Sequence, residues 1–163
     1  MLLSAHRFVQ YDRTVKTIYF YSPREEYGCF SNFSPHGFSL DGKWWATSEH
    51  FFQAQKFVGT PAEEEVRTAP TPREAAARGR DRRRPLRSDW EEVKDEVMKR
   101  AISAKFRTHS KLRAILLETA EQKLVENAPH DAYWGCGSDR NGLNRLGQLL
   151  MELRAELQRE AEA

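Results

Sequence analysis

The sequence predicts an α+β fold that is predominantly helical, with a small N-terminal antiparallel β-sheet. The run TIYFY at residues 17–21 is β-branched and aromatic, which is typical of a strand. FSL and KWW flank Asp41-Gly42, a dipeptide that favours a tight hairpin. After the hairpin, apolar residues recur mostly at helical spacing.

The chain has 163 residues, about the size of one domain, without an internal repeat or a linker-like stretch. We therefore expect a single domain over residues 1–163, with a core at about 17–158 and frayed termini. The start, MLLSAHRFVQ, lacks an h-region, and no apolar run approaches the roughly 20 residues of a membrane span. Two unclustered cysteines favour a reducing compartment, so the expected location is cytoplasmic.

The charges are nearly balanced, with 26 basic and 24 acidic residues. A net charge of +2 does not indicate general nucleic-acid or membrane binding. The sequence contains no CxxC pair and no Cys/His ligand cluster. Neither a metal nor a cofactor is expected.

Five helices are expected after the hairpin. The first begins at Thr47 or Ser48 and stops at Gly59. The second starts at the capping box Thr71-Pro72-Arg73-Glu74, with proline at the first helical position, and ends near Gly79.

The three later helices are expected from their caps and apolar positions. Ser88-Asp89-Trp90-Glu91 is a second capping box, and Ser110 is a candidate cap for the next helix. The tail AELQREAEA of the last helix is expected to be frayed. The inward positions of the three helices are, in order, Trp90, Val93, Val97, Ala101 and Ala104; Leu112, Ile115 and Leu116; and Leu143, Leu146, Leu150, Leu153 and Leu157.

The stretch SEHFFQAQKF places Glu49, Gln53 and Lys56 at spacings of four and three residues, hence on one helix face. On this pattern alone, such a stripe is more often a solvated face. Phenylalanines flank it on both sides, so it could instead line a cleft. A carboxylate near a helix N-terminus is expected to stay ionised beside the helix dipole, which suits a base or a cation stabiliser more than a proton donor.

The stretch DAYWGCGSDRNGLNRLG at 131–147 has three glycines within eight residues. Backbone amides at such a loop can hold an anion where the loop enters a helix. The alternative is a turn-rich loop with buried aromatic residues. The stretch matches neither GxxxxGK[ST] nor GxGxxG.

The stretch RGRDRRRPLRSDW at 78–90 has six arginines within ten residues, followed by Trp90. Arginine binds phosphate bidentately, and an indole can stack on a heterocycle. A solvated basic loop and a nucleic-acid patch are the alternatives, and the overall charge balance favours a local phosphate clamp. Paired carboxylates beside a sugar suit glycosidic cleavage, although the combination also fits a nucleotide-binding module.

Four stretches occur in register: FYSPREEYGCFSNF, WWATSEHFFQAQKF, ARGRDRRRPLRSDWEEVKDEVMKRAISAKF and LVENAPHDAYWGCGSDRNGLNRLGQLLMELR. Together they closely resemble the YbiA-like proteins of the NADAR (NAD- and ADP-ribose-associated) superfamily over roughly residues 17–158. The resemblance implies a YbiA-like fold and an N-glycosidase. Its substrates would be phosphorylated ribosylaminopyrimidine intermediates of riboflavin biosynthesis, with release of ribose 5-phosphate.

The resemblance also leaves two alternatives. One is a hydrolase that removes ADP-ribose from guanine bases, for which nucleic acid would be a partner. The other is a non-catalytic module that binds NAD or ADP-ribose. The small size and charge balance favour a small phosphoribosyl-heterocycle over nucleic acid.

The resemblance implies three functional positions, Glu49, Trp90 and Asp131, which match the family's motifs. Glu49 would orient water or stabilise positive charge, Asp131 would hold ribose hydroxyls or act as the second carboxylate, and Trp90 would stack on the pyrimidine. Lys56 would either hold phosphate or capture the sugar as a Schiff base, so it counts as catalytic. The further substrate-binding candidates are Asn32, Gln53, Arg80, Trp134, Gly135, Asn144 and Arg145.

Overall fold

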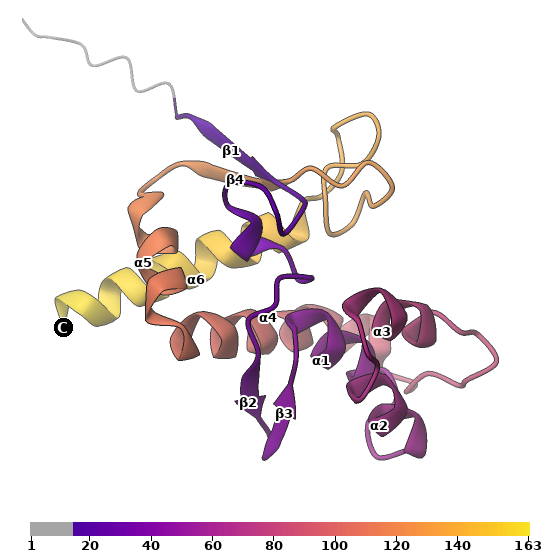
Figure 1. Cartoon of the computed structure of the whole chain (residues 1–163). Helices are drawn as coiled ribbons and strands as arrows, with labels where there is room; N and C mark the ends of the chain where they lie inside the picture. The colour runs from indigo at the N-terminus through magenta and orange to yellow at the C-terminus, as the bar shows by residue number, and fades with distance from the viewer. Residues whose placement is uncertain (1–14) are drawn as a thin grey trace, which may run out of the picture.

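The computed structural model describes residues 15–163, so the expectations for MLLSAHRFVQ and for a frayed N-terminus lie outside the described residues. Six α-helices, one 3-10 helix (η1, Gly28–Phe30) and two separate two-stranded sheets make up the described part. Figure 1 shows the long helix α4 (Trp90–Thr108) running across the molecule, with the other elements around it. The α+β expectation is confirmed.

The expected hairpin is present as β2 (Phe38–Leu40) and β3 (Lys43–Trp45), which pair antiparallel. Asp41 and Gly42 both have positive φ, 54° and 72°, as the preferred two-residue hairpin turn requires.

The first strand was expected to belong to the N-terminal antiparallel sheet, but it pairs with a strand much later in the chain. β1 (Thr17–Phe20) pairs in parallel with β4 (Lys123–Glu126), in the register Thr17 to Lys123. The antiparallel sheet is therefore the hairpin alone. The short segment KLVE was not identified as a strand from the sequence.

Three short helices follow the hairpin: α1 (Ser48–Gln55), α2 (Pro61–Arg67) and α3 (Pro72–Gly79). The Thr47 side chain accepts the N–H of His50 at the start of α1, and Thr71 accepts the N–H of Glu74 at the start of α3, as predicted. Helix α2 was not expected from the sequence. Gly79 allows α3 to approach α1, because a Cβ there would lie 2.0 Å from Gln53 Oε1.

Two of the expected caps are not formed. Asp89 precedes α4 without a side-chain cap bond, and its carboxylate accepts hydrogen bonds from Arg87. Ser88 therefore does not cap the helix. Helix α5 (Ser110–Glu118) begins at Ser110 itself, after His109.

The last helix, α6 (Arg145–Glu162), differs from expectation at both ends. Leu143 lies before it and is 58% exposed, so it is not an inward position. The tail is helical to Glu162 because Leu157 is buried and Arg107 pairs with Glu160. Gly147 lets α6 pack on β4, since a Cβ there would lie 2.2 Å from the Leu124 carbonyl oxygen.

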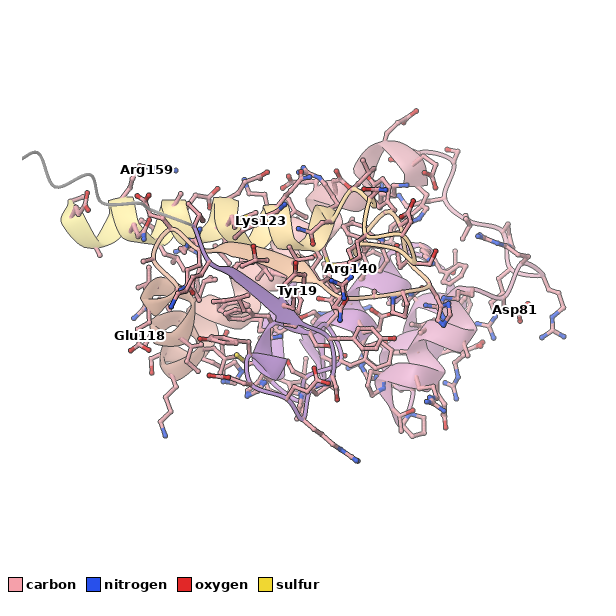
Figure 2. All side chains as sticks on the ribbon, turned by 90° about the horizontal axis from the view of Figure 1, so that it is seen from above. Tyr19, Asp81, Glu118, Lys123, Arg140 and Arg159 are labelled. Atoms are coloured by element: carbon pink, nitrogen blue, oxygen red, sulfur yellow. The ribbon has the colours of Figure 1, made fainter. Side chains whose placement is uncertain are left out.

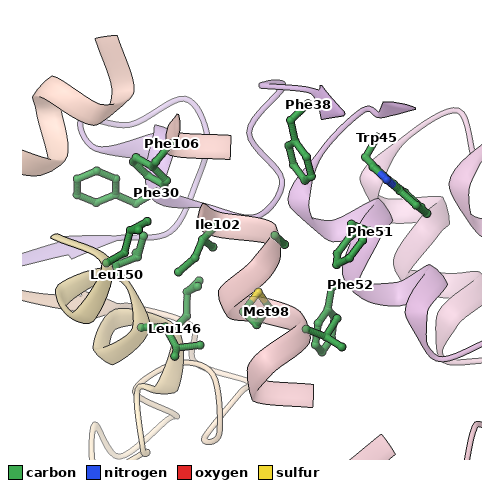
Figure 3. Close-up of a cluster of buried hydrophobic side chains, with 14 of the residues drawn as sticks. Phe30, Phe38, Trp45, Phe51, Phe52, Met98, Ile102, Phe106, Leu146 and Leu150 are labelled. Carbon is green, nitrogen blue, oxygen red and sulfur yellow. The ribbon is translucent and has the colours of Figure 1, made fainter. Parts of the chain in front are cut away.

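The core is aromatic where the hairpin and α1 meet α4, and aliphatic where α6 meets it (Figure 3). Phe51 of α1 packs edge-on against Trp45, with ring centroids 5.0 Å apart. Lys105 of α4 is fully buried, and its Nζ donates to the Ser31 carbonyl at 3.0 Å. This bond ties the 26–37 loop to the central helix.

Burial makes Lys105 a source of pH-dependent stability. Desolvation lowers its pKa from 10.5 to about 7, so between these values the unfolded chain binds more protons than the folded one. Stability from this group therefore rises with pH across that window. We expect the free energy of unfolding of the wild type, relative to Lys105→Met, to increase between about pH 7 and about pH 10 in urea titrations. Exposed Lys111→Met is the control, and an equal pH dependence in all three proteins would contradict the assignment.

Candidate active site

A cavity of about 850 Å³ opens between α1, α3, the start of α4, the end of β4 and the loops after β1 and after β4. Most of the residues that the sequence suggested for a site line it. The sequence-predicted residues in its wall are Asn32, Glu49, Gln53, Lys56, Arg80, Trp90, Asp131 and Trp134.

The polar stripe of α1 is buried. Glu49, Gln53 and Lys56 are only 6%, 3% and 7% exposed, which excludes a solvated helix face. Gln53 Nε2 donates to Glu49 Oε1 at 2.7 Å. The backbone N–H of Glu49 donates to the Asn32 carbonyl at 3.1 Å, which fixes the start of α1 against the loop that contributes Asn32 to the cavity.

Burial changes the expected protonation of Glu49. Desolvation raises the pKa of this carboxyl, although the Gln53 amide and the charges of Arg80 and Lys56 act in the opposite direction. The expectation that the helix N-terminus would keep Glu49 readily ionised is therefore wrong: loss of hydration outweighs the helix dipole.

Lys56 lies directly after α1, where its Nζ donates to the Gly79 carbonyl at 3.3 Å. The ammonium is 5.6 Å from the centroid of the Trp90 ring and 5.8 Å from that of Phe52. Burial lowers the pKa of Lys56 to about 8, and the charges of Arg82 and Arg80 act in the same direction. A lysine that is partly neutral near pH 7 can act as a nucleophile.

Two further carboxyl groups belong to this cavity. Asp131 Oδ1 accepts the backbone N–H groups of Tyr133 and Trp134 at 3.0 and 2.8 Å, which orients it. Glu126, the last residue of β4, also lines the cavity and was not singled out from the sequence. Burial and the charges of Asp131 and Glu49 raise its pKa to about 8. Recognising KLVE as a strand would have placed Glu126 at a strand end just before Asp131.

Three aromatic side chains line the same cavity as these carboxyl groups and form an aromatic wall. Phe52 lies between Trp90 and Trp134, with ring centroids 5.1 and 5.2 Å away. Trp90 is only 6% exposed and also belongs to the core, so both interpretations of this residue, core tryptophan and cavity wall, hold.

Three predicted substrate-binding residues do not line the cavity: Gly135, Asn144 and Arg145. Arg145 pairs with Asp95 at 2.6 Å. Gly135 permits close packing, because a Cβ there would lie 2.6 Å from the Ala128 Cβ. These three residues support the wall, and their assignment as substrate contacts is corrected.

Asn144 holds β4 in place. Its Oδ1 accepts the Glu126 N–H at 2.9 Å, and its Nδ2 donates to the Leu124 carbonyl at 2.8 Å. Its φ of 52° is one that asparagine tolerates better than most residues.

Several backbone N–H groups of the glycine-rich loop already have acceptors within the fold. The N–H groups of Gly137, Gly142 and Leu143 donate to carbonyls of the same loop, so they are occupied. Arg140 of this loop lies against Tyr19 of β1, with its guanidinium carbon 5.8 Å from the ring centroid (Figure 2). The loop therefore packs on β1.

The arginine run is largely neutralised by its own surroundings. Arg78, Arg83, Arg84 and Arg87 form ion pairs with nearby carboxylates, and Asp81 on the outer loop serves two of them (Figure 2). Arg80 makes no ion pair with any described residue and lines the cavity. Two cations that the sequence analysis did not select, Arg73 and Lys94, also line it.

Within residues 15–163, no group of three or more His, Cys, Asp or Glu side chains is arranged to hold a metal ion. A search of the same residues found no helix with the length and apolar character of a membrane span.

The family model described as the NADAR domain matches residues 19–158. The chain belongs to the NADAR family. This NADAR protein is 55% identical over 140 residues to the N-glycosidase YbiA of Escherichia coli K12, covering 86% of the chain and 88% of that protein. The NMR structure of E. coli YbiA matches with a TM-score of 0.85, covering 94% and 92% of the two chains at 51% identity.

A second group of relatives carries a pathway name. The chain is 44% identical to the chloroplastic riboflavin biosynthesis protein PYRR of Zea mays, over 86% of this chain and 25% of that protein. It is also 51% identical to the N-glycosidase Npun_R5314 of Nostoc punctiforme, over 86% and 92% of the two chains. These names confirm the expectation of a hydrolase of N-glycosyl bonds with a small-molecule substrate and support a role in the riboflavin pathway.

The role of Asn144 as a support can be tested by stability. Asn144→Ala leaves the Glu126 N–H and the Leu124 carbonyl without their partners, and each unpaired buried group costs about 1–3 kcal/mol. We expect the free energy of unfolding in urea to fall by roughly 2 kcal/mol or more. The control is exposed Asn141→Ala, whose side chain bonds to no described residue other than Asp139. A stable Asn144→Ala protein with only weakened substrate binding would restore the ligand assignment.

Proposed function

We propose that this protein hydrolyses the N-glycosidic bond of phosphorylated ribosylaminopyrimidines, releasing the aminopyrimidine and ribose 5-phosphate. The observation that carries the proposal is the cavity of about 850 Å³, where Glu49, Glu126 and Asp131 share one space with Lys56 and an aromatic wall. The N-glycosidase and riboflavin biosynthesis names of the relatives support the substrate class.

The cavity offers separate chemistry for each part of such a substrate. The aromatic wall of Trp90, Phe52 and Trp134 suits the flat pyrimidine. Arg80 and Arg73, both in the cavity wall, suit the 5-phosphate because guanidinium groups bind phosphate bidentately. The Oδ1 of buried Asn32, which has no hydrogen-bond partner among residues 15–163, can accept a hydrogen bond from a ribose hydroxyl.

Cleavage of the C1–N bond develops positive charge on C1 and O4 of the ribose. The Gln53 amide and the charges of Arg80 and Lys56 oppose the effect of burial and favour the Glu49 carboxylate, which would stabilise that charge. Its position is fixed by Gln53 and by the Asn32 carbonyl. Asp131, oriented by two backbone N–H groups, would take a proton from the attacking water.

Lys56 offers a covalent route to the same products. In the ring-opened substrate, C1 is joined to the pyrimidine nitrogen as an imine. Neutral Lys56 would attack C1, and the two protons of its amine would pass to the pyrimidine nitrogen, which leaves as a free amine while C1 becomes an imine of Lys56. The resulting imine would add water, release the aldehyde form of ribose 5-phosphate and regenerate the lysine. The lowered pKa of Lys56, about 8, supports this route over a role in phosphate binding alone.

Removal of a carboxylate tests the proposed substrate. Glu49→Gln and Asp131→Asn are expected to lower the release of free pyrimidine from phosphoribosyl-aminopyrimidine by roughly 10²-fold or more, because each loses charge in the transition state. Product is measured by chromatography. Glu118→Gln is the control for Glu49, and Asp139→Asn is the control for Asp131, because Asp139 also accepts a backbone N–H two residues on.

The same assay separates the alternatives. Release of unmodified guanine from ADP-ribosylated DNA, without pyrimidine release, would assign the protein to nucleic acid. Binding of ADP-ribose at micromolar concentrations without turnover of any substrate would make it a binding module. The nucleic-acid alternative is disfavoured by the ion pairs that occupy four of the six arginines of the 78–87 stretch.

Borohydride trapping tests the covalent route. We expect a trapped adduct of one ribose 5-phosphate on Lys56 in the wild type, detected by mass spectrometry, and none in Lys56→Ala. Trapping should increase as the pH rises through about 8, because only the neutral amine attacks. Exposed Lys111→Ala is the control. Full turnover without any adduct would return Lys56 to ligand binding.

A further inference from the structure

The reaction needs a proton donor that the sequence-predicted residues do not supply. An amine leaves C1 readily only if its nitrogen is protonated as the bond breaks. We propose that Glu126 is the general acid of this site, whose carboxyl group donates that proton. This inference rests on the proposed N-glycosidase function and adds a catalytic residue to it.

The position of Glu126 is set by its backbone. Its N–H donates to Asn144 Oδ1 at 2.9 Å, and its carbonyl accepts the N–H of Cys136 at 2.9 Å. It ends β4, which is held along its length by pairing with β1. Both polar backbone groups are therefore bonded, and the side chain lines the cavity from a fixed strand end.

Hydrogen bonding distinguishes the three carboxyl groups. Asp131 accepts two backbone N–H bonds, and Glu49 accepts the Gln53 amide. Such donors stabilise the ionised form. The Glu126 carboxyl accepts no hydrogen bond from any residue in the described part of the chain. Of the three, it is the group with the least support for a negative charge.

The charges around Glu126 act in the same direction. Asp131 and Glu49 disfavour ionisation of a third carboxyl, and burial adds to this, raising the pKa of Glu126 to about 8. Lys56 and Arg80 favour ionisation of Glu49 instead. His130 and Tyr21 share the cavity wall, and Arg145 of the adjoining α6 is engaged by Asp95.

The proton transfer balances in both routes. In direct hydrolysis, the C1–N electron pair goes to nitrogen, Glu126 gives that nitrogen its proton, and water adds to C1 while losing a proton to Asp131. Return of that proton to Glu126 completes the cycle. In the Lys56 route, Glu126 passes two protons from the Lys56 nitrogen to the leaving nitrogen, one as Lys56 adds to C1 and one as the C1–N bond breaks, and it ends protonated as it began.

The experiment compares leaving groups of graded basicity. N-(5-phosphoribosyl)anilines with increasingly electron-withdrawing substituents are hydrolysed by wild type, Glu126→Gln, Glu126→Asp and the control Glu118→Gln. We expect Glu126→Gln to lose roughly 10²- to 10³-fold in kcat/KM with unsubstituted aniline and less than about tenfold with a nitroaniline, which needs less protonation to leave. Glu126→Asp should recover part of the loss.

A pH profile provides a readout that a structural role would not change. Wild-type kcat/KM should fall as the pH rises through about 8, when Glu126 loses its proton, and this limb should be absent in Glu126→Gln. Unfolding in urea confirms that each variant is folded, which is expected because the Glu126 side chain makes no hydrogen bond with a described residue.

The outcomes separate this proposal from the function that it rests on. Two results would overturn the role of Glu126 alone, provided that the wild type hydrolyses the substrates. In one, Glu126→Gln loses activity equally for every leaving group. In the other, the activity of Glu126→Gln stays within twofold of wild type. Failure of the folded wild type to cleave any phosphoribosylamine overturns the proposed function and this inference together. If the loss of kcat/KM in Glu126→Gln becomes smaller as the leaving amine becomes less basic, both the proposed function and the role of Glu126 are supported.

Discussion

Burial of the polar stripe of α1 inside an aromatic core is the constraint on which the site depends. Moving a charged group out of water costs several kcal/mol unless partners compensate it. Here Gln53 bonds to Glu49, Lys56 bonds to the Gly79 carbonyl, and the Lys56 ammonium lies near the rings of Phe52 and Trp90. This compensation is partial, so the pKa of Glu49 rises and that of Lys56 falls. The chemistry of the cavity follows from this incomplete stabilisation.

Close backbone approaches make that burial possible. Gly79 brings the end of α3 against Gln53, and its carbonyl is the acceptor for Lys56, so one glycine both closes the cavity and bonds to its lysine. Gly147 allows a second close approach, of α6 to the Leu124 carbonyl, which also accepts a hydrogen bond from Asn144. The Glu126 carboxyl is thereby placed by a hydrogen-bonded strand end. Asp131 lies in the loop after β4, where the N–H groups of Tyr133 and Trp134 orient its carboxylate.

The features that could be predicted from the sequence are those that depend on residues close together along the chain. The Asp41-Gly42 turn, the Thr71 cap and the one-sided stripe of Glu49, Gln53 and Lys56 depend on neighbours within a few residues, and all are present. β4 could not be found in the same way, because its four residues form a strand by pairing with β1, about a hundred residues earlier. The alternatives for the glycine-rich loop and the arginine run could not be separated from the sequence for a related reason. Their amides and guanidinium groups look available in the sequence, but the fold occupies most of them.

The same desolvation that raises the pKa of Glu126 to about 8 lowers that of Lys56 to about 8. Two groups of opposite charge type are thus both biased toward their neutral forms, the acid as a proton donor and the amine as a nucleophile. In water at neutral pH, the two side chains would instead be a carboxylate and an ammonium. A carboxylate has no proton to donate, and an ammonium cannot act as a nucleophile. Because Glu49 lies near both groups and affects both pKa values, their titrations belong to the cavity as a unit rather than to single residues. A substitution at Glu49 therefore changes more than one carboxylate: it removes the charge that favours the proton on Glu126 and the ammonium form of Lys56.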